Sequence, residues 1–161
     1  MSATRTAPVR LLTSLSVALA LAASLFALTA VGPTTTRASA IVSAAKAGNA
    51  VAWARSRKGS PYQYGATGPH RFDCSGLTRW AYARVGKLLP HSSSAQAGRT
   101  KRIWHRSNAR RGDLVFFYGG GGVYHVGIYA GHGYVWHAPY SGARVRKEHI
   151  WTSNVFYGRV R

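Results

Sequence analysis

The spacing of apolar residues changes part-way along this 161-residue chain, and that change limits the folds it can adopt. Residues 42–57 lack proline and place their apolar side chains at helical spacing, which predicts a first helix ending near Gly59. A second helix is predicted from Asp73, a natural N-cap, to Gly86. Short β-branched and aromatic runs then predict strands at 113–118, 123–130, 134–139 and 154–160, with the glycines at 119–122 as a hairpin loop. Helices followed by consecutive strands indicate an α+β fold with an antiparallel sheet.

The first forty residues have the features of an export signal. Arg5 and Arg10 precede a long apolar run at 11–31, and a small-residue A-x-A site follows at 38–40. This order predicts a secretory signal at 1–40, removed after Ala40, and a single folded domain at 41–161. An uncleaved membrane anchor is the alternative, because the apolar run is long enough to span a bilayer.

The charge of the chain is strongly one-sided. It contains 22 Lys and Arg residues against three Asp and Glu residues, for a formal net charge of +19. Such a field attracts polyanions. For an exported protein these would be anionic cell-wall polymers or membrane lipid, with nucleic acid as the general alternative and a solvated surface without a specific partner as another.

The scarcity of acidic residues excludes several kinds of chemistry. A glycosidase needs two carboxylates that flank the scissile bond, and only Asp73, Asp113 and Glu148 exist. Calcium or magnesium sites need clustered oxygen ligands, which three acids spread over the chain do not supply. The chain also lacks the G-x-S-x-G motif that would indicate a serine hydrolase.

Cys74, the only cysteine, has three possible roles. A lone cysteine is often a small buried hydrophobe, and a zinc site with two histidines is a second possibility, although no short ligand spacing supports it. The third role is a nucleophile, because the predicted helix start would lower the thiol pKa through the helix dipole and unpaired N–H groups.

Two of the seven histidines fit a nucleophilic cysteine best. His125 and His137 each lie inside a predicted strand between apolar neighbours, and adjacent strands of a hairpin can place both imidazoles on one face. A base next to the thiol and a third group that orients the base would complete the activation.

Together these segments resemble the NlpC/P60 family of cell-wall peptidases. The resemblance rests on P-Y-x-Y-G at 61–65, D-C-S-G at 73–76, G-D-L-V-F-F at 112–117, H-V-G-I-Y at 125–129 and H-A-P at 137–139, in that order. It extends from about Val51 to Arg159. Tyr64, His91 and Arg111 depart from the usual family pattern.

The resemblance implies a papain-like α+β fold and roles for particular residues. Cys74 would be the nucleophile, His125 the general base and His137 the group that orients His125. Tyr62 would help to hold the oxyanion. Asp73 and Ser75 would line the substrate-binding side, and no metal or organic cofactor is implied.

The function implied is an exported, monomeric cysteine endopeptidase of peptidoglycan stem peptides. The expected bond joins γ-D-glutamyl to a diamino acid, and nucleic acid is not expected as a partner. Two alternatives remain: a wall- or polyanion-binding module without catalysis, and an amidase or acyltransferase that uses the same thiol.

Overall fold

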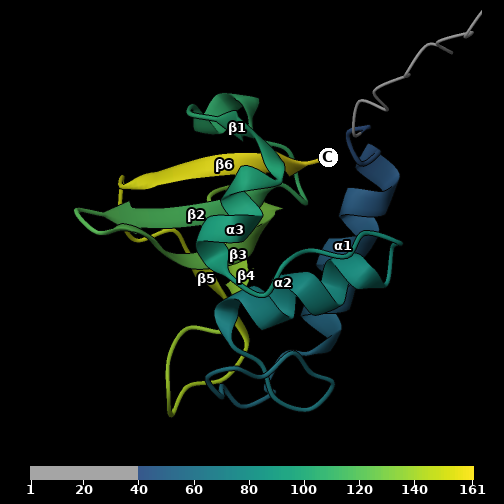
Figure 1. The fold of residues 1–161 in the computed structure, drawn as a ribbon, viewed down its shortest axis with the longest axis vertical. Helices are drawn as coiled ribbons and strands as arrows, with labels where there is room; N and C mark the ends of the chain where they lie inside the picture. Colours follow the sequence, from purple (N-terminus) through teal and green to yellow (C-terminus); the bar gives the residue numbers. More distant parts are fainter. Residues whose placement is uncertain (1–39) are drawn as a thin grey trace, which may run out of the picture. The chain divides into compact units, whose positions relative to one another are not determined.

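A computed structural model describes residues 40–161 of the chain (Figure 1). Apart from Ala40, the segment predicted to be an export signal lies outside the described residues. Within residues 40–161, no helix combines the length and apolar character needed to cross a bilayer.

Among the described residues, three α-helices precede all of the strands. Helix α1 (Ala44–Ser56) begins at the N-cap Ser43, and α2 (Cys74–Ala83) begins at the N-cap Asp73, so both predicted helices are present. A short third helix, α3 (Ser93–Gly98), was not predicted. Its sequence is mainly polar and its one buried residue is Gln96, so it lacks the apolar spacing that identifies a helix.

The strands form one antiparallel sheet of six strands in the order β1-β6-β2-β3-β4-β5. Their bounds are β1 (Thr100–Ile103), β2 (Leu114–Gly119), β3 (Gly122–Gly131), β4 (Tyr134–His137), β5 (Arg146–His149) and β6 (Val155–Val160). The four predicted strands are confirmed, and Gly119 pairs with Gly122 to close the predicted hairpin. The α+β prediction is therefore confirmed.

The two strands that were not predicted are the edges of this sheet. β1 has the sequence TKRI and β5 the sequence RKEH, and neither shows the apolar alternation of a half-buried strand. Charged side chains are common on edge strands, where they prevent pairing with other chains. The pattern that would identify these strands is therefore absent.

The main core lies between the helices and one face of the sheet. Val51 and Ala54 of α1 and Leu77 of α2 pack with inward residues of the sheet such as Phe116 and Ile128, all at most 1% exposed. A smaller cluster on the opposite face contains Val115, Phe117, Tyr129, Val135 and Tyr157. Because the main core fixes α2 against β3, the start of α2 lies at the sheet.

Candidate active site

Cys74 is the first residue of α2 and reaches the backbone of β3. The Asp73 side chain caps the helix by accepting the Gly76 N–H at 2.6 Å. The Cys74 sulfur receives backbone hydrogen bonds from Val126, from Ser75 and from its own N–H. Val126 directly follows His125, so the start of α2 lies against the strand that carries the predicted base.

The protonation of Cys74 differs from the sequence-based expectation. Burial raises the pKa of the Cys74 thiol, and the nearby Asp73 carboxylate raises it further, while the three backbone hydrogen bonds lower it. The net direction is upward, so the expected fall in pKa at a helix start was wrong. The resting site therefore holds a neutral thiol that needs a base at the moment of reaction.

His125 and His137 are in direct contact. The Nε2 atom of His125 lies 2.9 Å from the Nδ1 atom of His137. They come from the adjacent antiparallel strands β3 and β4, and both are at most 6% exposed. The hairpin thus places the two imidazoles on one face.

Glu148 on the edge strand β5 continues this chain of hydrogen bonds. Its Oε2 atom lies 2.9 Å from Nε2 of His137 and 2.9 Å from the Arg146 guanidinium. Burial alone would raise the pKa of Glu148, but the hydrogen bonds from Arg146 and His137 outweigh it and lower that pKa below its ordinary value. Glu148 is therefore ionised at neutral pH and acts only as an acceptor.

The ionised carboxylate fixes where the protons are on both histidines. Since Glu148 only accepts, Nε2 of His137 donates to it, and in the neutral ring Nδ1 of His137 is then an acceptor. Nε2 of His125 must therefore donate to His137, which leaves Nδ1 of His125 with a free lone pair. That nitrogen can accept the thiol proton.

Burial keeps both histidines neutral. It lowers the pKa of His125 to about 3, helped by the neighbouring His137 and opposed by Glu148. Burial also lowers the pKa of His137, although the hydrogen bond that His137 donates to Glu148 opposes this shift. Two neutral rings are what the proton arrangement requires.

Tyr62 lies near the thiol on the loop before α2. Burial raises the pKa of the Tyr62 hydroxyl, and the proximity of Cys74 and Asp73 raises it further. The loop is held by an N–H···O bond of 2.9 Å from Tyr62 to Ala143 and by a bridge to Phe72. Tyr62 is thus a neutral donor beside the predicted nucleophile.

Asp73 and Ser75 lie on either side of Cys74, and both are 6% exposed. The Ser75 hydroxyl donates to Oδ1 of Asp73 at 3.1 Å. Oδ2 of Asp73 accepts the Gly65 N–H at 2.9 Å and lies 2.7 Å from Nε2 of His91. These contacts tie the Tyr62 loop and His91 to the start of α2.

An open pocket of about 410 Å³ lies next to the two histidines. Trp151 is 51% exposed, and its ring centroid is 5.4 Å from that of His137. A register shift between β2 and β3 leaves Tyr124 without a partner on β2, and its exposed ring also lines the pocket. The other lining residues are Pro139, Tyr140, Arg146 and Glu148.

The zinc alternative does not fit this geometry. One ring nitrogen of His125 and one of His137 form the hydrogen bond between the two rings, and the second nitrogen of His137 is hydrogen-bonded to Glu148. In the part of the chain described, from Ala40 to Arg161, no three His, Cys, Asp or Glu side chains converge as metal ligands would.

Sequence reasoning missed Glu148, Arg146 and Trp151. The two charged residues belong to an edge strand without an apolar period, and Trp151 follows it in a loop. The composition offered one signal for Glu148. In a chain with three acidic residues and 22 Lys and Arg residues, each carboxylate is expected to have a basic partner.

Comparison with protein-family models matches residues 59–160 to the NlpC/P60 family. A probable endopeptidase of Corynebacterium glutamicum is 49% identical over 108 residues, covering 67% of this chain and 50% of the relative. The probable endopeptidase p60 of Listeria monocytogenes is 43% identical over 99 residues, covering 62% of this chain and 20% of the relative. The bifunctional muramidase/DL-endopeptidase CwlT of Bacillus subtilis is 40% identical over 111 residues, covering 65% and 33%. The chain thus matches half or less of the length of these relatives.

Solved structures show the same fold. The NlpC/P60 domain of the peptidoglycan hydrolase SagA aligns with a TM-score of 0.66 and 36% identity, covering 74% of this chain and all of that domain. A mutated form of the resuscitation promoting factor interacting protein RipA aligns with a TM-score of 0.65 and 31% identity, covering 72% of this chain and 62% of that one. With the family match over 59–160 and the shared fold, the chain belongs to the NlpC/P60 family of papain-like cysteine peptidases.

Proposed function

We propose that this protein is an exported cysteine endopeptidase that hydrolyses peptidoglycan stem peptides. The hydrogen-bond chain from Glu148 through His137 to His125 carries the proposal, because it leaves Nδ1 of His125 unprotonated. Endopeptidases among the relatives and the match to a peptidoglycan hydrolase domain support the substrate class.

In the proposed reaction, His125 takes the proton of the Cys74 thiol as the sulfur attacks the carbonyl carbon of the peptide bond. Negative charge develops on the carbonyl oxygen, where the Tyr62 hydroxyl and backbone N–H groups at the start of α2 would stabilise it. The C–N bond then breaks, and the amine leaves with the proton from His125. Water, deprotonated by His125, then attacks the thioester carbonyl carbon. The C–S bond breaks, the acid product leaves, and His125 returns the proton to the Cys74 thiolate.

We also propose roles for the capping residue and its neighbour. Asp73 and Ser75 hold the first turn of α2 and the Tyr62 loop in one arrangement. In this proposal they shape the substrate-binding side beside Cys74 through that loop. The bond between γ-D-glutamyl and a diamino acid is the proposed site of cleavage.

Digestion of purified cell walls tests the proposal. The protein and its Cys74→Ala variant are incubated with walls, and the released fragments are identified by mass spectrometry. The exposed surface variant Lys101→Gln is the matched control and should digest like the wild type. We expect new fragments with a free diamino-acid amine from the wild type and none from Cys74→Ala.

Equal release by both proteins would remove Cys74 from the mechanism. Transfer of the acyl group to an added amine, without hydrolysis, would indicate an acyltransferase instead. Wall binding by the wild type without any release of fragments would indicate a module that only binds.

A further inference from the structure

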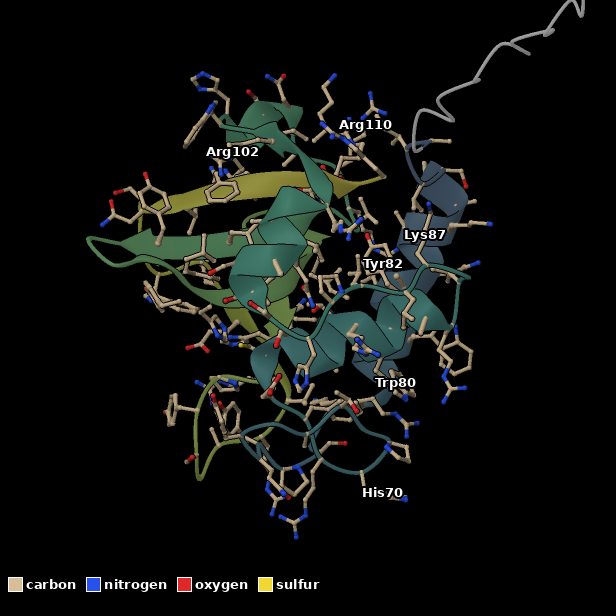
Figure 2. All side chains as sticks on the ribbon, viewed as in Figure 1. His70, Trp80, Tyr82, Lys87, Arg102 and Arg110 are labelled. Carbon is tan, nitrogen blue, oxygen red and sulfur yellow. The ribbon has the colours of Figure 1, made fainter. Side chains whose placement is uncertain are left out.

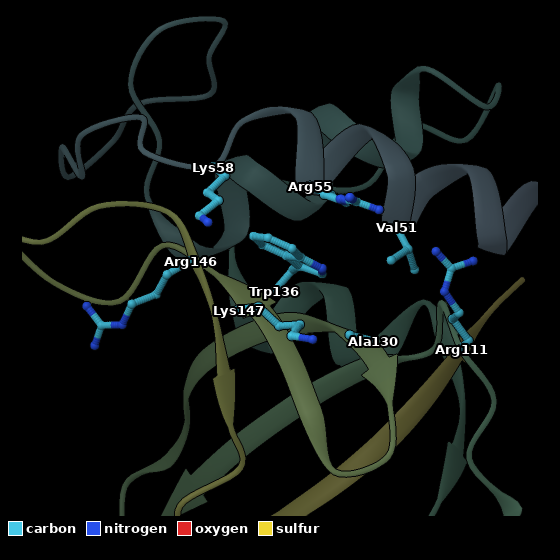
Figure 3. A pocket seen from close by; sticks show the side chains of 8 residues that line it. All are labelled: Val51, Arg55, Lys58, Arg111, Ala130, Trp136, Arg146 and Lys147. Carbon is cyan, nitrogen blue, oxygen red and sulfur yellow. The ribbon is translucent and has the colours of Figure 1, made fainter.

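A second pocket, of about 590 Å³, lies between α1 and the strands β4 and β5 (Figure 3). Five of its eight lining side chains are basic, and the other three are apolar. The basic ones are Arg55, Lys58, Arg111, Arg146 and Lys147, and the apolar ones are Val51, Ala130 and Trp136. We refer to this pocket as the basic groove.

The positive charge of the basic groove is almost uncompensated. The chain has three carboxylate side chains, and each has a basic partner: Asp73 bonds His91, Asp113 bonds Arg159, and Glu148 bonds Arg146 and His137. Arg146 is therefore the one groove cation that shares a carboxylate. The other four, Arg55, Lys58, Arg111 and Lys147, have no carboxylate partner among the described residues.

The cations are spread along the length of the groove and are not gathered at one point. Figure 3 shows Arg111 at one end of the groove and Arg146 at the other, with Trp136 and Lys147 between them and Arg55 and Lys58 above on the α1 side. Arg146 also lines the pocket beside His137, so one end of the groove adjoins the candidate active site. A linear ligand with repeated negative charges fits this arrangement better than a single ion.

We propose that the basic groove binds the phosphodiester backbone of a linear anionic cell-wall polymer. A guanidinium presents a planar fork of donors that matches the oxygens of a phosphate, and Arg55 and Arg111 offer two such forks. Lys58 and Lys147 add ammonium charges along the groove. Bound in this way, the polymer would hold the protein on the wall, with the histidine pocket next to the end of the groove.

Other polyanions fit the groove less well. The groove is concave, whereas lipid headgroups form a plane that meets flat or convex surfaces. Single-stranded nucleic acid gains affinity when its bases stack on exposed aromatic rings. The one aromatic residue of the groove, Trp136, is only 6% exposed and offers little stacking surface.

The charge elsewhere on the molecule provides an internal control. Basic side chains such as Lys87, Arg102 and Arg110 project from separate parts of the chain (Figure 2). One other pocket, lined by Arg79, Lys87, Arg99 and Arg161, also gathers four bases, but Arg79 is used to donate to the Leu89 carbonyl at 3.0 Å. That pocket does not share a lining residue with the histidine pocket.

Binding of the full-length chain to poly(glycerol phosphate), measured by calorimetry at several salt concentrations, tests the proposal. The groove variant carries Arg55→Gln, Lys58→Gln and Arg111→Gln. The control variant carries Lys87→Gln, Arg99→Gln and Arg161→Gln, which removes the same charges from the other pocket. Arg146 stays unchanged because it holds Glu148. Binding needs no peptide cleavage, so the result is independent of the proposed hydrolysis.

We expect the groove variant to bind about tenfold or more weakly, with a shallower salt dependence, and the control variant to lose less than about threefold. The far-UV circular dichroism spectrum of the groove variant should match that of the wild type, which shows that it folds, and its hydrolysis of a soluble muropeptide should be unchanged. If it does not fold, the double variant Arg55→Gln/Lys58→Gln takes its place. Equal weakening in both variants, or none in the groove variant, would overturn the proposal. The proposal would also be overturned if the groove variant lost binding to phosphatidylglycerol vesicles or single-stranded DNA but not to poly(glycerol phosphate).

Discussion

The Oε2 atom of Glu148 lies 2.9 Å from Nε2 of His137, and this contact determines the tautomer of two histidines. Because the carboxylate is ionised, its hydrogen bond places a proton on Nε2 of His137 and, through His137, on Nε2 of His125. The position of the proton on His125 is therefore set by a residue on the edge strand of the sheet. The hydrogen-bonded chain thus extends beyond the two histidines to Glu148.

The first prediction concerns Glu148→Gln. An amide is uncharged and can present either a donor or an acceptor to His137, so it no longer enforces one tautomer. We expect kcat to fall about tenfold to hundredfold with little change in KM. This loss is smaller than the loss seen when the missing carboxylate is hydrogen-bonded to the base itself, because Glu148 acts through His137. Steady-state kinetics on a purified muropeptide measures this effect.

His149→Gln is the matched control for Glu148→Gln. His149 is the next residue of the same strand and is exposed, with its ring against Tyr134. This variant should keep wild-type kinetics. If Glu148→Gln also keeps a wild-type kcat, the carboxylate does not control the histidines.

The second prediction concerns acid stability. The pKa of His125 is about 3 in the folded chain against an ordinary value of 6.5, mainly because of burial. Between these values the unfolded chain binds a proton that the folded chain does not, so the free energy of unfolding falls as the pH drops from about 6.5 towards 3. Urea unfolding of His125→Gln over this range should show a weaker pH dependence than the wild type. Identical slopes would mean that His125 is not held neutral by the fold.

Much of the site could be predicted from sequence because its parts lie in regular elements. Asp73 has the chemistry of an N-cap, and the strands around His125 and His137 show clear apolar patterns, so their positions follow from local rules. The predicted direction of the Cys74 pKa shift was wrong for a physical reason. A helix start identifies the N–H donors, but the burial that outweighs them comes from contacts of α2 with β3 that no local pattern reports. Glu148 was not predicted as a site residue, because it lies on an edge strand of charged residues that shows no apolar period.

The third prediction concerns Asp73, whose carboxylate joins the helix cap, the Tyr62 loop and His91. Asp73→Ala removes the cap and leaves the Gly65 and Gly76 N–H groups without that acceptor. We expect the free energy of unfolding in urea to fall by about 2–4 kcal/mol. Ser43→Ala removes the cap of α1, which is exposed and has a single longer bond of 3.4 Å, and should cost about 0.5–1 kcal/mol. Equal losses would show that Asp73 does no more than cap its helix.

The fourth prediction concerns Gly127 on β3, two residues after His125. A Cβ atom there would lie 2.8 Å from the Trp136 carbonyl oxygen and 3.1 Å from Cβ of His137, and closer still to a Val135 methyl group. Gly127→Ala must therefore push β4 away from β3, which costs about 1–3 kcal/mol and lengthens the contact between the two histidines. We expect a lower thermal midpoint and a lower kcat together. Gly120→Ala in the hairpin, where nothing lies within 4 Å of the added Cβ, should change the free energy of unfolding by less than about 0.5 kcal/mol and leave kcat unchanged. A destabilised Gly127→Ala protein with a wild-type kcat would show that catalysis tolerates a looser pair of histidines.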